Sequence, residues 1–429
     1  MQNSRAVIIL DNREALRVVA SAGRISTTGG SALEVLKKAD GGERDLRLVG
    51  KVLSSGHRSV LEHQTLSVAF DNVSVLVEQF VIEFRLASFT VKSRRYVDFS
   101  DAGYVLPEGA PEGFGERMEA LFALYARLLE LGIPREDARF VLPYCFRSNF
   151  YVTLNARELA HMLGAMLYGH GARCAEIRAL GASLRDQFER LYPGALEDAA
   201  AFATAPARTP EGFSAPQVAV GDAQLLCGPE DGKILERALA FTRRSLTMSE
   251  LPRDGRAREL ELMNYVFCVR DVSLSCVTHF ARHRMQSPLF MPTLDALCRG
   301  RYVLPDTVAA VPEAREAYES AFREQSAFAR EMVARGLAME DAAYCALSGH
   351  TADILFSMNA RELAHFFRLR TCERAQWEIR AVAWRMLGLL RARCAELFDE
   401  CGPSCLVTGR CPEGRLSCGR PYRKGETRR

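Results

Sequence analysis

The sequence predicts an α+β protein made of two tandem copies of one domain, each a mixed sheet with long helices. The seven residues from Asn155 to His161 return letter for letter from Asn359 to His365. The four residues from Tyr104 to Pro107 return from Tyr302 to Pro305 at a similar spacing. Within each copy, strand-like and helix-like patterns alternate without βαβ regularity, which favours the α+β class.

The two copies are separated by a stretch rich in alanine, glycine and proline. It runs from about Pro193 to Gly232 and is typical of a linker followed by the first strand of the next domain. We therefore predict a first repeat over residues 1–215, a second repeat over residues 216–400 and a cysteine-rich tail over residues 401–429.

Hydrophobic periodicity places the main elements of each repeat. A short strand is expected at Val7–Leu10, and alternation of apolar and polar residues predicts another at Gln64–Phe70. The apolar stripe between Glu112 and Leu131 is typical of an amphipathic helix packed on a core. The repeated Asn-Ala-Arg motif opens a long helix, expected to reach about Leu191 in the first repeat and about Phe398 in the second.

Composition excludes several classes of protein. The chain has 429 residues, 48% hydrophobic and 25% charged, and a formal charge of +3, which does not support a nucleic-acid binder. No signal peptide and no membrane span are expected, which predicts a cytoplasmic location. Most of the thirteen cysteines lie in apolar segments, so we expect reduced thiols.

The triplet Arg282-His283-Arg284 concentrates three cationic or polar planar groups in one place. Arginine stays charged and binds phosphate or carboxylate through two parallel hydrogen bonds. A nucleotide or a dinucleotide cofactor is therefore the expected partner, although a run of basic residues is more often a solvated surface.

Three motifs of the second repeat together resemble the flavin-dependent thymidylate synthase family. They are Arg282-His-Arg284, Asn359-Ala-Arg-Glu-Leu-Ala-His-Phe-Phe-Arg-Leu-Arg370 and Ala375-Gln-Trp-Glu-Ile-Arg380. The first repeat carries Gly56-His-x-Ser-x-Leu-Glu-His63 and Ala87–Tyr96, which are similar to further segments of the same family.

The resemblance implies reductive methylation of dUMP to dTMP, with FAD as cofactor and with methylenetetrahydrofolate and NADPH as co-substrates. It implies a catalytic role for Arg370 at the N3 edge of the pyrimidine. The residues implied to bind dUMP are Lys92, Ser93, Arg95, Arg139, His279, Arg282 and Arg370. Those implied to bind FAD are Ser59, Arg282, His283, Arg284, Asn359, Arg361 and His365.

Each repeat departs from the family pattern where the other keeps it. In the first repeat the triplet has become Glu83-Phe84-Arg85, and Met166 stands where the second repeat has Arg370. In the second repeat the positions of Ser93, Arg95 and Arg139 hold other residues, namely Pro292, Leu294 and Ala343. Val91 also stands where family members usually carry glutamate or glutamine, a side chain that touches both ligands.

Family members resemble one another in being homotetramers whose active sites lie between subunits. If the two repeats pair as such subunits do, we expect one composite site per chain and a homodimer that forms a pseudo-tetramer. Two other functions stay open: a related flavoenzyme acting on a pyrimidine nucleotide, such as a hydroxymethylase, and a nucleotide- or flavin-binding protein without turnover.

The tail contains four thiols that could enclose a structural zinc ion. They are Cys401, Cys405, Cys411 and Cys418, among turn-forming glycine and proline. Their spacing lacks the paired C-x2-C knuckles of strong zinc sites, so a reduced and solvated tail is the alternative.

Overall fold

The computed structural model describes residues 4–11, 14–25, 27–197, 199–202 and 209–422. The chain divides into two compact units. The first unit is Met1–Gly212 together with Ala327–Ala346, and the second is Phe213–Ser326 together with Leu347–Arg429. Part of the second repeat therefore packs with the first unit, namely the end of the long helix α13 (Pro312–Ala334) and the segment that follows it.

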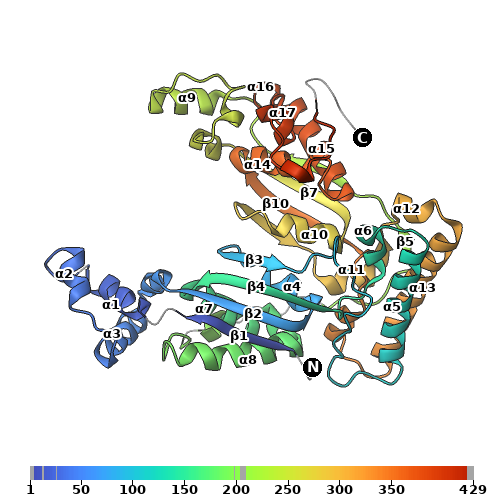
Figure 1. The fold of residues 1–429 in the computed structure, drawn as a ribbon, viewed down its shortest axis with the longest axis horizontal. Helices are drawn as coiled ribbons and strands as arrows, with labels where there is room; N and C mark the ends of the chain where they lie inside the picture. The colour runs from blue at the N-terminus through green and yellow to red at the C-terminus, as the bar shows by residue number, and fades with distance from the viewer. Residues whose placement is uncertain (1–3, 12–13, 26, 198, 203–208, 423–429) are drawn as a thin grey trace. The chain divides into compact units, whose positions relative to one another are not determined.

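The first unit is built on a four-stranded antiparallel sheet in the order β1-β2-β4-β3 (Figure 1). Its strands are β1 (Arg5–Asp11), β2 (Thr65–Ser74), β3 (Ala87–Val91) and β4 (Arg147–Asn155). Alternate residues of β2 and β4 are buried, because successive side chains of a strand point to opposite faces. The strands expected at Val7–Leu10 and Gln64–Phe70 are thus confirmed within β1 and β2.

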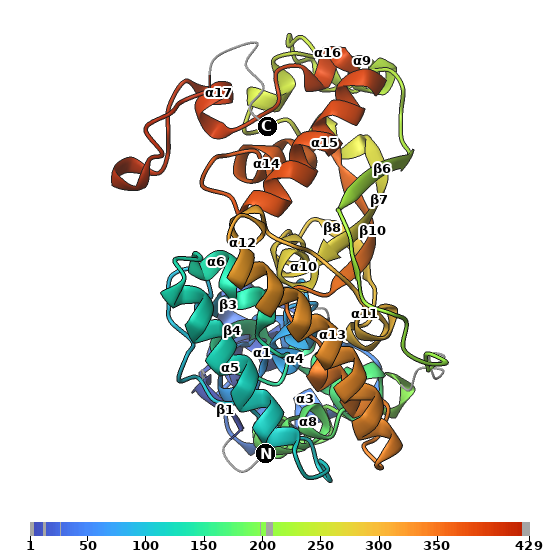
Figure 2. The same ribbon diagram turned by 90° about the vertical axis from the view of Figure 1, so that its right-hand side faces the viewer.

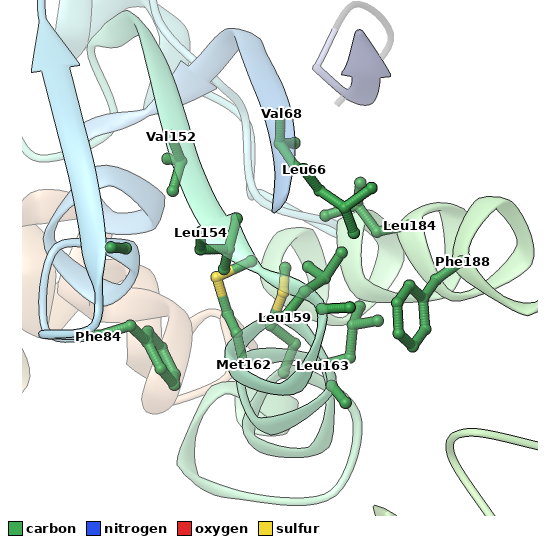
Figure 3. Packing of buried hydrophobic residues seen from close by; sticks show 14 of the residues in the cluster. Leu66, Val68, Phe84, Val152, Leu154, Leu159, Met162, Leu163, Leu184 and Phe188 are labelled. Carbon is green, nitrogen blue, oxygen red and sulfur yellow. The ribbon is translucent and has the colours of Figure 1, made fainter. Parts of the chain in front are cut away.

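Helices cover one face of this sheet, and their apolar sides form the core (Figure 3). Leu66, Val68, Val152 and Leu154 of the strands face Leu159 and Met162 of α7 and Leu184 of α8, and all seven are buried. The helices of this part of the chain are α1 (Ala15–Ile25), α2 (Ala32–Lys37), α3 (Glu43–Ser54), η1 (Arg58–His63), α4 (Val75–Val81), α5 (Phe114–Glu130), α6 (Arg135–Ala138), η2 (Arg139–Val141), α7 (Ala156–Leu167), η3 (His170–Arg173), α8 (Ala175–Glu189) and η4 (Ala199–Phe202).

The second unit repeats the same sheet, in the order β6-β7-β10-β8. Its strands are β6 (Asp222–Cys227), β7 (Asn264–Ser273), β8 (Gln286–Phe290) and β10 (Thr351–Asn359), with a separate parallel pair of β5 (Gln217–Val218) and β9 (Arg301–Tyr302). Each long strand β2 and β7 has one residue with a left-handed backbone, Asn72 (φ 55°) and Asp271 (φ 54°), at the corresponding place beside a register shift. The duplicated fold therefore extends to local backbone detail.

Helices α14 and α15 flank the second sheet, as Figure 2 shows. The helices of the second repeat and the tail are α9 (Lys233–Thr242), η5 (Leu251–Arg253), η6 (Arg258–Leu262), α10 (Leu274–Ala281), α11 (Thr293–Arg299), α12 (Asp306–Ala309), α13 (Pro312–Ala334), η7 (Glu340–Cys345), α14 (Ala360–Arg370), α15 (Trp377–Arg393), α16 (Ala395–Phe398), α17 (Ser404–Thr408) and η8 (Gly414–Leu416). No described helix has the length and apolar character needed to cross a bilayer.

The long helix predicted after each Asn-Ala-Arg motif is two helices, so that prediction was wrong. In the first repeat α7 ends at Leu167, and the chain turns through Gly169 and Gly171 before α8 begins. A side chain on Gly171 would meet Phe80 at 2.7 Å, so only glycine fits this turn. In the second repeat the side chain of Gln376 accepts hydrogen bonds from the first amides of α15, which starts a new helix after α14.

The segment Ala327–Ala346 contacts the first unit mainly through buried groups. The hydroxyl of Tyr344 donates to Glu176 at 2.8 Å, and the backbone N–H of Tyr144 donates to the carbonyl of Ala346 at 2.7 Å; all four residues are buried. The ring of the half-buried Phe328 lies 5.7 Å from that of Phe114. These contacts explain why this segment belongs to the first unit.

Candidate active site

The arginine-histidine-arginine triplet lies in the second unit, directly after α10. Ser273 caps this helix by accepting a hydrogen bond from the N–H of Cys276 at 3.0 Å. The carboxylate of Glu378, on α15, accepts from both the N–H and the hydroxyl of Ser273, at 2.6 and 2.5 Å. Since Ser273 and Glu378 are both buried, this contact fixes where α10 starts and hence where Arg282 follows its end.

His283 lies between a carboxylate and a guanidinium. Its Nδ1 is 2.8 Å from Oε1 of Glu362, and Nε of Arg370 donates to its Nε2 at 3.0 Å. The imidazole is 3% exposed and its ring packs on the edge of Phe366 at 4.8 Å. Burial lowers the pKa of His283, and the Arg370 guanidinium adds to this effect against the opposing Glu362.

The Asn-Ala-Arg motif begins α14 by capping it. The side chain of Asn359 accepts a hydrogen bond from the N–H of Glu362 at 2.9 Å, and Asn155 does the same for Glu158 at 2.8 Å in the first repeat. The presence of the Asn-Ala-Arg motif in both repeats is thus explained in part by its role in capping the start of a helix. Arg361 pairs with Glu261 at 2.5 Å and donates to the carbonyl of Gly255 at 3.3 Å.

A cavity of about 480 Å³ opens beside these residues in the second unit. Three of the predicted flavin-binding residues line it, Asn359, Arg361 and His365. Two further lining residues, Met285 and Arg368, were missed by sequence reasoning, although Arg368 stands in the quoted motif. Nε of Arg368 is buried and has no hydrogen-bond partner among the described residues.

The remaining predicted residues of this half lie on or near the same elements. Arg282 and Arg284 are exposed, on either side of the buried His283. His279 lies in the last turn of α10, where its carbonyl accepts from Nη2 of Arg370 at 3.4 Å. Ser59 lies exposed on η1 of the first unit.

A second group of predicted residues lies in the first unit around Glu136. Nε of Arg95 is 2.7 Å from Oε1 of Glu136, and Nε of Arg139 donates to the Glu136 carbonyl at 3.0 Å. Ser93 accepts a hydrogen bond from the N–H of Arg95 at 3.4 Å. Lys92 is exposed, with its ammonium 5.4 Å from the ring of Phe99.

Arg139 is 4% exposed, and its Nη2 atom has no hydrogen-bond partner among the described residues. Burial and then the neighbouring Arg94 lower the pKa of Arg139 to about 10. Arg94, which sequence reasoning missed, pairs with the buried Glu78 at 2.6 Å. A buried guanidinium with an unpaired donor beside other arginines is a site that an anion would stabilise.

In the second repeat, a helix stands at the place of the loop that carries Ser93 and Arg95 in the first repeat. Pro292 stands at the N-cap of α11, a helix that occurs at this place only in the second repeat of the described chain. At the end of α11, Arg299 pairs with Asp271 at 3.2 Å and with Asp353 at 3.0 Å. Ion pairs within the protein thus occupy the place where the first repeat has the loop of Ser93 and Arg95.

The first repeat has likewise filled the place of the triplet with apolar packing. Phe84 is 7% exposed and contacts the ring of His161 edge-on at 5.4 Å. Met166, which corresponds to Arg370, is fully buried in the hydrophobic core. Glu83 lies 3.6 Å from His170. A charged ligand finds no arginine pair there comparable with that of the second repeat.

Two comparisons place this chain among known proteins. The family described as "Thymidylate synthase complementing protein" matches it twice, over residues 8–194 and 217–395. This chain belongs to that family. Among the relatives of this chain is the flavin-dependent thymidylate synthase of Geobacter sulfurreducens. The two sequences are 35% identical over 209 residues, which cover 48% of this chain and 90% of that protein. The enzyme of the same name from Pyrococcus abyssi is 34% identical over 172 residues, which cover 38% of this chain and 70% of that protein.

Two solved structures match a similar length. A thymidylate synthase X from Helicobacter pylori with FAD and dUMP has a TM-score of 0.39 at 20% identity, covering 46% of this chain and 99% of that one. A UMP/dUMP methylase from Streptomyces cacaoi has a TM-score of 0.37 at 27% identity, covering 47% and 96%. The coverages of the Geobacter and Pyrococcus enzymes show that each of these relatives corresponds in length to about one repeat.

The four cysteines of the tail do not form a metal site among the described residues of this family member. No group of three or more histidine, cysteine, aspartate or glutamate side chains in the described ranges is arranged to hold a metal ion. Cys401 is buried and its thiol points to the carbonyl of Leu397 at 3.8 Å, whereas Cys411 is exposed. The structure gives the predicted zinc ion no support.

Proposed function

We propose that this chain is a flavin-dependent thymidylate synthase that methylates dUMP to dTMP at one composite site per chain. Methylenetetrahydrofolate would donate the carbon, NADPH would be the reductant and FAD the cofactor. One observation carries the proposal: each repeat keeps the residues of one half of the site and has refilled the other half with packing or ion pairs. Random decay would not leave two complementary halves.

The first unit would bind the phosphate of dUMP. Arg139 has an unpaired buried donor, and Arg95 is held beside it by Glu136. A phosphate would take the place of the Glu136 carboxylate as the partner of Arg95 and would add a partner for Arg139. Ser93 supplies a hydroxyl and Lys92 a further charge at the same loop, as the family pattern implies.

The second unit would bind the pyrimidine and the flavin. Negative charge that develops at N3, C4 and O4 of the pyrimidine is stabilised by a fixed guanidinium, the role proposed for Arg370 together with His279. Arg282, Arg284 and Arg361 would bind the phosphates and other oxygens of FAD, with Asn359, His283 and His365 as polar neighbours and Ser59 from the first unit. When bound, FAD supplies the hydride chemistry, and the chain supplies position and charge. The unpaired Nε of Arg368 fits such an anionic cofactor.

Two copies of the chain would form a homodimer equivalent to the four subunits of a single-repeat family member. Assembly of this kind would bring the two halves together, either within one chain or across two. A cytoplasmic location suits an enzyme of nucleotide synthesis with reduced thiols, and we propose it here.

The decisive experiment measures both binding and product. Purified protein loaded with FAD should bind one dUMP per chain in a titration, and it should form dTMP from dUMP, methylenetetrahydrofolate and NADPH. Two tight dUMP sites per chain, or none with FAD bound, would refute the composite site. Rescue of a thymidine-requiring strain by the wild type, and its loss in both Ser93→Ala and Arg282→Ala, would show that both repeats serve one reaction.

A related reaction, such as hydroxymethylation of a pyrimidine nucleotide, is the second candidate. It is favoured by Val91, a half-buried residue that packs on the apolar core at the end of β3 and cannot form the hydrogen bonds of glutamate or glutamine. Identification of the nucleotide product by mass spectrometry separates the two reactions, because a hydroxymethyl product is heavier than dTMP by one oxygen.

A further inference from the structure

Glu362, His283 and Arg370 form a continuous hydrogen-bonded chain in the second unit. Oε1 of Glu362 contacts Nδ1 of His283 at 2.8 Å, and the opposite ring nitrogen contacts Nε of Arg370 at 3.0 Å. We propose that Glu362 is a positioning residue, which holds His283 in the tautomer with a proton on Nδ1 so that Nε2 fixes the direction of the Arg370 guanidinium. This inference rests on the proposed function, in which Arg370 acts on the pyrimidine.

The tautomer follows from the donors and acceptors on each side of the ring. Nε of Arg370 always carries a hydrogen, so the atom facing it must offer a lone pair, and that atom is Nε2 of His283. The single proton of the neutral ring therefore lies on Nδ1, where the Glu362 carboxylate accepts it. A doubly protonated ring would direct an N–H against the guanidinium in a site where the imidazole is only 3% exposed.

In the first repeat, the glutamate that corresponds to Glu362 has no histidine at the position that corresponds to His283. Glu158, the counterpart of Glu362, is also buried and also lies at the start of its helix. It accepts from the backbone N–H of Leu86 at 3.4 Å and lies 3.6 Å from Nδ1 of His161, while Phe84 and Met166 fill the places of His283 and Arg370. Among the described residues of the two repeats, the chain from carboxylate through imidazole to guanidinium therefore occurs in the second repeat alone.

The tautomer can be measured without any turnover. Nitrogen-15 spectra of the FAD-bound protein labelled at its eight histidines, with His283→Asn to assign the ring, should show His283 neutral and protonated on Nδ1. In Glu362→Gln the amide can donate to Nδ1, so the proton should move to Nε2 in a measurable fraction of the molecules. The matched Glu158→Gln should leave the His283 signals unchanged. A cationic His283 near neutral pH, or an Nε2–H tautomer in the wild type, would overturn the inference whatever the Glu362→Gln variant shows.

Kinetics then separate positioning from a merely structural role. Glu362→Gln should lower kcat/KM for dUMP by about 10- to 100-fold, as loss of a supporting hydrogen bond commonly does. In an Arg370→Ala background the same substitution should cause no further loss, because the group that it positions is gone. Equal losses in both backgrounds would reduce Glu362 to a folding role and refute the proposal. If the protein forms no dTMP at all, the proposed function fails, while the nitrogen-15 result still decides the tautomer.

Discussion

His350 is a buried histidine whose replacement should change how the stability of the protein depends on pH. It is fully buried, its Nδ1 accepts a hydrogen bond from the N–H of Leu347 at 2.8 Å, and its ring meets Phe322 edge-on. Nε2 has no hydrogen-bond partner among the described residues. Burial lowers the pKa of His350 from 6.5 to about 4.

The sign of the pH effect follows from linkage between protonation and folding. The folded state keeps His350 neutral, whereas the unfolded chain takes up a proton below about pH 6.5. The contribution of His350 to stability is therefore complete above that pH and is lost as the pH falls toward 4. The total loss is about 3 kcal/mol, of which about 2 kcal/mol falls between about pH 7.5 and about pH 5.

The residues at the corresponding positions of the first repeat suggest a double variant that removes the pH dependence due to His350. Phe146 and Pro143 stand where the second repeat has His350 and Leu347, so the first repeat has neither the imidazole nor the N–H that it binds. Ala346 has an extended backbone (φ −60°, ψ 131°), which suits a proline at the next position. The double variant Leu347→Pro/His350→Phe should therefore fold.

Urea unfolding at several pH values tests the prediction. The wild type should lose about 2 kcal/mol more than the double variant between about pH 7.5 and about pH 5, because all other groups titrate in both proteins. The single variant His350→Phe leaves the Leu347 N–H without an acceptor and should be destabilised by about 1–3 kcal/mol near pH 7.5, and by about 2 kcal/mol less near pH 5, where the wild type has lost most of the His350 contribution. Equal pH dependence in the wild type and the double variant would refute the assignment to His350.

Three further predictions concern the two halves of the site. Arg139→Ala should weaken dUMP binding by about 10- to 100-fold without changing FAD content, as loss of a charged hydrogen bond implies, whereas Arg135→Ala on the preceding helix α6 should bind dUMP normally; calorimetry checks both. Chains carrying Ser93→Ala and Arg282→Ala, each inactive alone, should regain dTMP formation when co-expressed if the site forms across two chains, and they should stay inactive if it forms within one. Ser273→Ala removes the cap of α10 and leaves the buried carboxylate of Glu378 without its hydroxyl partner, so the free energy of unfolding should fall by about 2–4 kcal/mol. A loss below about 1 kcal/mol would show that this contact does not hold α10 in place.

Much of the fold could be predicted from local patterns. The repeated Asn-Ala-Arg motif identified two copies of one domain, and the structure shows the same strand order in both sheets. The alternation in β2 and the apolar stripe of α5 were sufficient to place those elements. Helix breaks after α7 and α14 were missed, because Gly171 and Gln376 act through contacts that no periodicity reveals. The repeat boundary near residue 215 stays a prediction.

The candidate site was less accessible to sequence reasoning. The family motifs identified the arginines and His283, but Arg94 and Arg368 were missed because their burial and unpaired donors appear only in the folded chain. The four-cysteine zinc site was suggested by composition alone, and the thiols do not gather in the described part of the tail.

By itself, the sequence determined the duplication, the family and the complementary departures of the two repeats from the family pattern, because each of these depends on residue identity at short spacing. Tertiary structure alone decided that His283 is buried between Glu362 and Arg370, with its pKa lowered, and that Ala327–Ala346 packs with the first unit. The physical reason is distance along the chain: Glu362 and Arg370 lie 79 and 87 residues from His283. Protonation depends on burial and on the donors and acceptors that folding brings together, and neither can be read from neighbours in the sequence.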